Sequence, residues 1–286
     1  MKYLVVGGTG TVGSDLVAKL TSAGEQVGVL TRHGDKAKNL PTGATAVVGD
    51  LMDPTSVSKI FNGVENVFLL NAVSTTELHE GLSAVWGARH AGVKKMVYLS
   101  VHNADQAWHV PHFGAKVVVE NALKSSGMTW TILRPNNFFQ NDVWFKDAIT
   151  KYGVYPQPMG DIGISRVDIR DIGLAAFNAL TKTGFEGQTF TLAGPHPLNG
   201  NATAEILSKH LGKKINFAGN DLNAWERQAL TSMPSWMVWD FKLMYKHFQD
   251  KGLIATHSEL ERQKKLLGRD PMTYDNFVGE LAKLWK

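Results

Sequence analysis

The sequence predicts an α/β fold in which a doubly wound parallel sheet is joined to a smaller, mostly helical C-terminal lobe. Short apolar runs alternate with segments of helical spacing over the first 150 residues, as in chains that cross from strand to helix to strand. The runs are continuously apolar, which is typical of strands covered on both faces. A turn with four glycines connects the first run to the first helix.

The expected elements follow one another in a regular order. Six strands are expected at residues 3–6, 26–30, 44–49, 66–70, 94–100 and 130–134. The first helix places Leu16, Val17 and Leu20 on one face and ends at Gly24. Three further helices, each followed by a glycine, are expected at residues 54–61, 75–91 and 111–126.

Beyond Pro135 the alternation weakens. We expect one more helix over residues 167–180 and one more strand over 188–194, after which the chain is mostly helical and rich in tryptophan. The sequence therefore predicts two parts: a sheet domain at residues 1–152, to which 165–193 returns, and a smaller lobe at 153–164 and 194–286.

Composition excludes several classes of function. The formal net charge of the 286 residues is only +4, and the basic side chains are scattered, so no nucleic-acid footprint is expected. Cysteine is absent, which excludes disulfides, a cysteine nucleophile and iron–sulfur ligation. Neither a signal peptide nor an apolar run long enough for a membrane span is found, so we expect a cytoplasmic protein without membrane association.

The turn GGTGTVG lies between the first strand and the first helix, and its glycines form the pattern G-x-G-x-x-G. This context indicates a dinucleotide-binding turn, in which glycines let backbone amides approach a pyrophosphate at a helix N-terminus. The sheet domain is thus expected to be a Rossmann domain. The residues expected to hold the pyrophosphate are Gly7, Gly8, Thr9, Gly10, Thr11, Val12 and Gly13.

The end of the second strand indicates which dinucleotide binds. An NAD site usually has a carboxylate there for the ribose 2′-hydroxyl, whereas this chain has Arg32, with Lys36 and Lys38 close by. A guanidinium suits a 2′-phosphate, so NADP(H) is expected, with NAD(H) as the alternative coenzyme. Solvated loop charges, with Asp35 on the ribose, are the other interpretation.

The next two strand ends also face the expected coenzyme. Asp50 and Leu51 follow the third strand, and Asp50 would either accept from the adenine amino group or cap the helix that starts at Pro54. Three residues that end the fourth strand, two of them small apolar ones, would let the coenzyme lie across the sheet edge: Asn71, Ala72 and Val73.

Several stretches together resemble a known family. GGTGTVG, VYLSVH, HFGAK and WTILRPNNFFQN are similar to the NmrA-like branch of the atypical short-chain dehydrogenases. That branch includes quinone oxidoreductases, triphenylmethane and azo dye reductases, isoflavone-reductase-type enzymes, and regulators that bind NADP without known chemistry. The resemblance runs over the whole chain and implies either a reductase or such a regulator.

The resemblance also implies where chemistry would occur. Ordinary short-chain dehydrogenases use Ser, Tyr and Lys; here Ser100 and Lys116 match the first and last, and His112 takes the tyrosine position. His112 and Lys116 are four residues apart on one helix face, so both can reach one bound ring. Imidazole can donate a proton at neutral pH. A surface ion pair between Lys116 and Glu120, and a solvated His112, are the alternatives.

The resemblance also implies that the turn after the sixth strand lies beside the nicotinamide. Asn136 and Asn137 would bind its carboxamide or brace the loop, and Phe138 would lie against the ring. Phe138, Trp144 and Trp236 are expected to wall an apolar acceptor pocket, with core packing as the alternative for each.

No metal is expected. His102, His109 and His112 are close in sequence but lack any metal-binding pattern.

These patterns favour an NADPH-dependent reductase that transfers hydride to a conjugated apolar acceptor, with a quinone as the first candidate. The alternative is a non-catalytic NADP(H)-binding redox sensor that acts on a protein partner. Homodimer formation is left open.

Overall fold

The structure, a computed structural model, describes residues 1–34 and 40–285. Asp35, Lys36 and Lys38, which the sequence analysis places near the coenzyme, lie outside the described residues.

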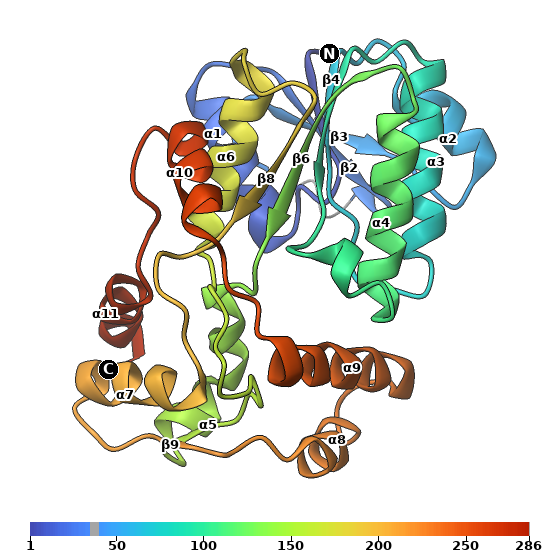
Figure 1. The fold of residues 1–286 in the computed structure, drawn as a ribbon. Coiled ribbons are helices and arrows are strands. Elements are labelled where there is room, and N and C mark those ends of the chain that lie inside the picture. Colours follow the sequence, from blue (N-terminus) through green and yellow to red (C-terminus); the bar gives the residue numbers. More distant parts are fainter. Residues whose placement is uncertain (35–39, 286) are drawn as a thin grey trace.

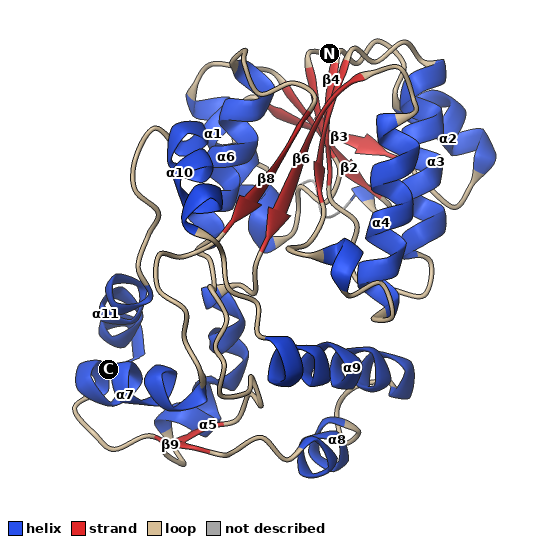
Figure 2. Ribbon diagram, viewed as in Figure 1, coloured by secondary structure: helices blue, strands red, loops and turns tan. Residues whose placement is uncertain are grey.

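Seven parallel strands form one sheet in the order β3-β2-β1-β4-β5-β6-β8 (Figure 2). Neighbouring strands are in register along β1, where Leu4 pairs with Gly28 on one side and Val67 on the other. The strands are β1 (Tyr3–Val5), β2 (Val27–Thr31), β3 (Ala44–Val48), β4 (Asn66–Leu69), β5 (Lys95–Leu99), β6 (Thr129–Pro135) and β8 (Gln188–Leu192). The order reverses between β1 and β4, which creates the crevice where ligands bind in doubly wound sheets.

Helices cover both faces of the sheet (Figure 1). One face carries α1 (Thr11–Ser22), α6 (Ile169–Thr181) and α10 (His257–Leu267); the other carries α2 (Pro54–Ile60), α3 (Glu77–His90) and α4 (Pro111–Lys124). Side chains of β1 alternate between the two resulting cores, with Tyr3 and Val5 in one and Leu4 in the other. The doubly wound α/β fold predicted from the sequence is therefore confirmed.

A smaller, mostly helical lobe lies below the carboxyl ends of the strands (Figure 1). It contains a short parallel pair, β7 and β9, and a third apolar core. Its elements are η3 (Phe139–Phe145), α5 (Lys146–Thr150), β7 (Val154–Tyr155), α7 (Gly200–Leu211), β9 (Asn216–Phe217), α8 (Leu222–Ala229), α9 (Ser235–Lys251) and α11 (Tyr274–Trp285).

The helix α10 differs from the expected division of the chain. The sequence predicts residues 194–286 in the lobe, but α10 packs against α6 and β8, and Leu266 and Leu267 belong to a core of the sheet. The chain therefore returns to the sheet once more between α9 and α11. There α10 covers apolar side chains of α6 and β8 that would otherwise face solvent.

The two parts are joined along a seam, defined here as the bridges that Ile164 makes with Leu198 and Leu253. The backbone amide of Ile164 donates to Leu198, which donates back, and the amide of Leu253 donates to the carbonyl of Gly163. Beside the seam the fully buried Arg166 is paired with the equally buried Asp142 at 2.9 Å. Three chain segments distant in sequence are thus held together between sheet and lobe.

None of the helices in residues 1–34 and 40–285 has the length and apolar character that crossing a bilayer requires.

Candidate functional site

The glycine turn has the backbone shape that a pyrophosphate site requires. Gly7 adopts a left-handed φ of +79°, and a Cβ on Gly13 would lie 2.2 Å from the carbonyl oxygen of Gly7. Gly10 caps α1 without any side-chain hydrogen bond, and Thr9, Gly10 and Thr11 are exposed. The first amides of α1 therefore point into open space at the positive end of the helix, which fits an anion.

The neighbouring strand ends present further groups at the same edge. Arg32 directly follows β2 and is exposed, and Leu51, which follows β3, is buried. Asn71, which follows β4 and precedes Ala72 and Val73, is only 4% exposed, and neither atom of its side-chain amide has a hydrogen-bond partner among the described residues. Buried amides rarely lack partners, so Asn71 fits a polar group of a bound ligand.

One alternative for Asp50 is wrong. The N-cap of α2 is Asp53, whose carboxylate accepts from the amide of Thr55 at 2.9 Å. Asp50 instead accepts from the amide of Met52 at 2.9 Å, in a local turn that leaves its other oxygen without a partner among the described residues. Asp53 is closer to the first turn of the helix, which is why it takes the capping role.

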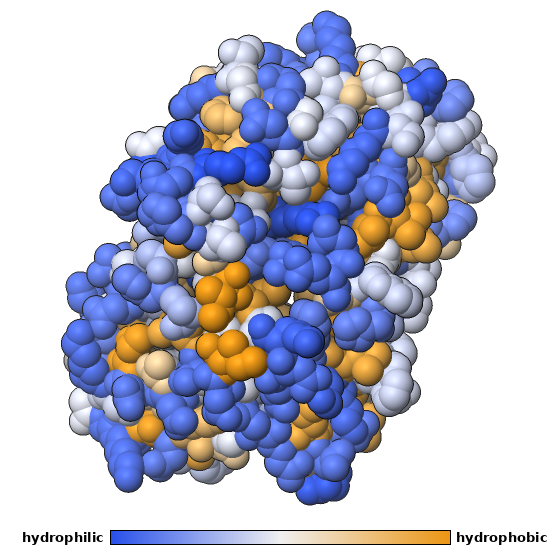
Figure 3. All heavy atoms as spheres, in the orientation of Figure 1, coloured by the Kyte–Doolittle hydropathy of each residue, from blue (hydrophilic) through white to orange (hydrophobic). Residues whose placement is uncertain are grey.

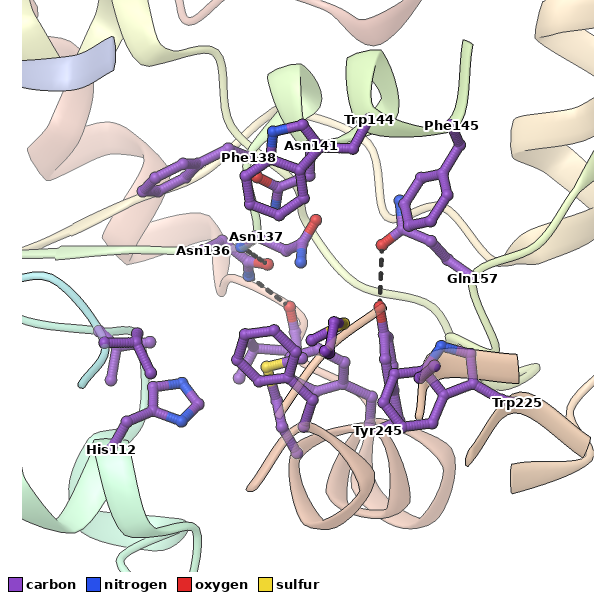
Figure 4. Close-up of a pocket in the computed structure, with 18 of the residues that line it drawn as sticks. His112, Asn136, Asn137, Phe138, Asn141, Trp144, Phe145, Gln157, Trp225 and Tyr245 are labelled. Atoms are coloured by element: carbon purple, nitrogen blue, oxygen red, sulfur yellow. Dashed lines mark hydrogen bonds between the residues drawn. The ribbon is translucent and has the colours of Figure 1, made fainter. Parts of the chain in front are cut away.

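A cavity of about 560 Å³ opens next to Val73, between the sheet and the lobe (Figure 4). It brings together residues from β5, α4, the turn after β6 and the lobe. The residues predicted from the sequence that line it are Val73, Ser100, His112, Lys116, Asn136, Asn137, Phe138 and Trp144. In Figure 3 apolar side chains reach the surface around the junction of the two parts, amid a mostly hydrophilic surface.

Lys116 is buried and its ion pair differs from the expected one. Its ammonium lies 2.7 Å from the carboxylate of Glu77 at the start of α3, and Glu77 is 2% exposed. The alternative interpretation, a surface ion pair between Lys116 and Glu120, is therefore wrong. Glu120 is itself 1% exposed and forms ion pairs with Arg134 and Lys124. Burial raises the pKa of Glu120, but the hydrogen bonds from Arg134 and Ser100, together with the charges of Arg134 and Lys124, outweigh burial and hold that pKa below its usual value.

His112 is 8% exposed, so it is not a solvated residue of the helix start. Its Nδ1 contacts Oδ1 of Asp240 on α9, and its backbone amide donates to Oδ2 of the same carboxylate at 3.1 Å. The ring also lies edge-on to Phe113 and Phe241. His112 lines the cavity from α4 and lies below Asn136 and Asn137 in the view of Figure 4.

The contacts of the two asparagines brace the turn after β6. The amide nitrogen of Asn136 donates to the carbonyl of Leu253 at 2.7 Å and to Nδ1 of His102 at 3.0 Å. The side-chain oxygen of Asn137 accepts from Arg166 at 3.1 Å. Asn136, which is 1% exposed, thus fixes the turn beneath the cavity through contacts to the lobe.

The three histidines close in sequence have separate partners. His102 binds Asn136, the ring of His109 lies 5.6 Å from that of His247, and His112 binds Asp240. Burial holds the pKa of His102 below its usual value, so this ring stays neutral near pH 7.

Two of the three aromatic residues predicted to line the acceptor pocket do line the cavity. Phe138 and Trp144 line the cavity, with Trp144 76% exposed at its rim, whereas Trp236 is absent from the lining. The side of α9 that faces the cavity follows helical spacing from Phe241, which directs Trp236 away from it. Among the further lining residues, which were not expected from the sequence, are the aromatic and aliphatic side chains of Trp225, Phe241, Met244, Tyr245 and Phe248.

A parallel sheet with a glycine turn at the head of its first helix, and a lobe over the carboxyl ends of its strands, defines a dinucleotide-binding protein of the short-chain dehydrogenase type. The chain belongs to the NmrA-like family, whose model matches residues 1–278. This confirms the resemblance noted in the sequence.

Similar proteins include two reductases and one solved structure. The chain is 34% identical over 233 residues to the NAD(P)H azoreductase of Xenophilus azovorans, covering 80% of each chain. It is 32% identical over 216 residues to the (4-alkanoyl-5-oxo-2,5-dihydrofuran-3-yl)methyl phosphate reductase of Streptomyces griseus, covering 75% of each. The fold matches that of the Escherichia coli NADPH-dependent quinone oxidoreductase QOR2 complexed with NADPH, with a TM-score of 0.88 and 23% identity over 98% of this chain and 99% of that one.

Proposed function

We propose that this protein is an NADPH-dependent reductase that transfers hydride to a conjugated, apolar acceptor such as a quinone. The observation that carries the proposal is the cavity of about 560 Å³ at the carboxyl edge of the sheet, next to Val73. Its position is the one that doubly wound sheets use for ligands, and its walls are mainly aromatic and aliphatic. The names of the two reductase relatives support the same class of reaction.

The residues at the sheet edge fit a nicotinamide dinucleotide. The amides of the glycine turn would hold the pyrophosphate, Arg32 the 2′-phosphate of NADP(H), and Asp50 and Leu51 the adenine. The side-chain amide of Asn71, which has no hydrogen-bond partner in the described part of the chain, would be satisfied by a polar atom of the coenzyme. When bound, this coenzyme supplies the hydride. NAD(H) is the alternative, which Arg32 disfavours.

Residues of the cavity take separate roles in the proposal. Lys116, held by Glu77, would contact the nicotinamide ribose from α4. His112 faces the acceptor and would supply a proton where the reaction needs one. Ser100 lines the same wall and would orient the acceptor or the coenzyme amide by a hydrogen bond.

The proposal is tested by following NADPH oxidation by purified protein over a panel of quinones, cationic dyes and enones. Turnover of at least one class is expected, and Trp225→Ala should raise KM for the best acceptor about fivefold because an aromatic wall is lost. Trp236→Ala is the matched control, since Trp236 lies in the same lobe and does not line the cavity; its KM should match that of the wild type.

The same test distinguishes the reductase from the alternative function, a non-catalytic redox sensor. Clear NADPH binding by calorimetry with no turnover of any acceptor would replace the reductase by a redox sensor that acts on a protein partner. Absence of binding to either nicotinamide coenzyme would overturn both. A cytoplasmic location is a further part of the proposal, which cell fractionation tests; whether the chain forms a homodimer stays open, and light scattering measures it.

A further inference from the structure

We propose that Asp240 of α9 is a positioning residue that holds the ring of His112 so that its Nε2 delivers a proton to the acceptor, which makes oxygen-bearing acceptors that gain a proton the preferred substrates. This inference rests on the proposed reductase function and names the acceptor class. It adds to the site a residue that is distant in sequence from His112.

Among the described residues, the hydrogen bonds and the ion pair of Asp240 are all made with His112. One oxygen of the carboxylate contacts Nδ1 of the ring and the other accepts from the backbone amide of the same residue at 3.1 Å. Asp240 is 4% exposed, and His112 is its only ion-pair partner in the part of the chain that the structure describes. A buried carboxylate needs a compensating donor, and here Nδ1–H of His112 is that donor.

This arrangement leaves one ring nitrogen for the cavity. With Nδ1–H donated to Asp240, rotation of the ring is blocked, and Phe113 and Phe241 contact it edge-on at centroid distances of 4.7 and 5.9 Å. Nε2 makes no hydrogen bond to any described residue, and His112 faces the cavity (Figure 4). A carboxylate that accepts from one imidazole nitrogen aims the other at the reacting atoms and stabilises the imidazolium, whose Nε2–H can then be donated.

The chemistry balances for a quinone. Reduction to the hydroquinone consumes one hydride, which oxidises NADPH to NADP⁺, and one proton. The hydride forms a bond to one carbonyl oxygen of the quinone, the π bonds shift so that the ring becomes aromatic, and the freed electron pair ends on the other carbonyl oxygen. That oxygen takes the proton from Nε2–H of His112 in its imidazolium form, which leaves a neutral ring with Nδ1–H on Asp240. Water then returns a proton to Nε2. A cationic triphenylmethane dye differs, because hydride addition to its central carbon gives a neutral product without any proton.

That difference supplies the experiment. Asp240→Asn should lower kcat for a quinone at least about tenfold, with a smaller change in KM, because proton donation by a misoriented ring is slower. Reduction of a cationic triphenylmethane dye needs no proton, so the ratio of kcat for quinone over dye should fall about tenfold. Asp250→Asn, on an exposed residue of the same helix, is the matched control and should leave that ratio unchanged.

A second readout is independent of turnover. Nitrogen-15 NMR of the His112 ring should show a protonated Nδ1 in the wild type and a loss of that preference in Asp240→Asn. If Asp240→Asn fails to fold, His112→Gln, which keeps a polar side chain beside the carboxylate, should give the same tenfold fall in the kcat ratio.

The outcomes are distinguishable. An unchanged kcat ratio, an equal loss with both acceptors, or an unchanged Nδ1 signal would each overturn the positioning role, and Asp240 would then simply join α9 to the start of α4. If the wild-type protein fails to oxidise NADPH with any acceptor of the panel, the proposed function is overturned instead. The NMR experiment still reports on the contact between Asp240 and His112 in that case.

Discussion

The glycine turn at residues 7–13 and the cavity between sheet and lobe are built in opposite ways. The turn is made of backbone from seven consecutive residues, and its shape depends on the absence of side chains at Gly7 and Gly13. The cavity is made of side chains from α4, the turn after β6, α8 and α9, which are distant in sequence. A site of the first kind can be recognised from a short motif, whereas a site of the second kind exists only once the chain has folded.

The largest loss of stability is expected for a substitution at Gly13, where the backbone of α1 lies close to the backbone of Gly7. Gly13→Ala should lower the free energy of unfolding by more than about 2 kcal/mol and abolish NADPH binding, because the new Cβ would lie 2.2 Å from the carbonyl oxygen of Gly7. Gly10→Ala is the comparison, since its Cβ would have no neighbour closer than 3.4 Å; its stability should stay within about 0.5 kcal/mol of the wild type. Urea denaturation measures both, and equal stabilities would contradict the backbone account.

The second effect concerns a buried ion pair of the cavity wall. Lys116→Met should destabilise the protein by about 3 kcal/mol, since the carboxylate of Glu77 is left buried without its partner. The double variant Lys116→Met with Glu77→Gln should recover part of that loss, although NADPH should bind weakly to both variants. A double variant no more stable than Lys116→Met in urea denaturation would show that the two residues are not coupled.

The third effect concerns Arg32, which follows β2 near the glycine turn. Arg32→Ala should reduce the preference for NADPH over NADH about tenfold or more, because a charge-assisted contact to the 2′-phosphate is lost while the rest of the coenzyme is unaffected. The dissociation constants of both coenzymes, measured by calorimetry, give the ratio. A ratio equal to that of the wild type would assign the phosphate to other residues.

The smallest effect is a pH dependence at the base of the cavity. Burial holds the pKa of His102 below 6.5 in the folded state, so the unfolded chain takes up its proton first as the pH falls. The free energy of unfolding should therefore decline below about pH 6.5, by at most about 1.4 kcal/mol per pH unit for this group.

His102→Gln should make that decline shallower. The decline should not vanish, because burial also lowers the pKa of His247. Urea denaturation at a series of pH values measures it, and an unchanged slope would mean that His102 does not titrate differently in the two states.

The strands and helices of the sheet domain were predictable to within a few residues, because apolar runs, glycines and helix-start prolines are local signals. The charged partners Glu77 and Asp240 were not, since nothing local to Lys116 or His112 indicates which distant carboxylate meets them. The helical spacing around Lys116 suggested Glu120, but Arg134 competes for that carboxylate in the folded protein.

The lobe shows a second limit of sequence reasoning. A tryptophan-rich helical stretch predicts an apolar surface but not its direction, so Trp236 was expected in the pocket, where Trp225 lies instead. The return of α10 to the sheet was also unpredicted, because its apolar residues fit a lobe core as well as the sheet core.

The seam at Ile164 has a thermodynamic consequence. Three segments that run between sheet and lobe are bridged to one another at that junction, so we expect the two parts to unfold together. Calorimetry should therefore record one endotherm, with a van't Hoff enthalpy equal to the calorimetric enthalpy. Both walls of the binding crevice should then unfold in one cooperative transition, so a substitution that destabilises the lobe should also lower the stability of the coenzyme site.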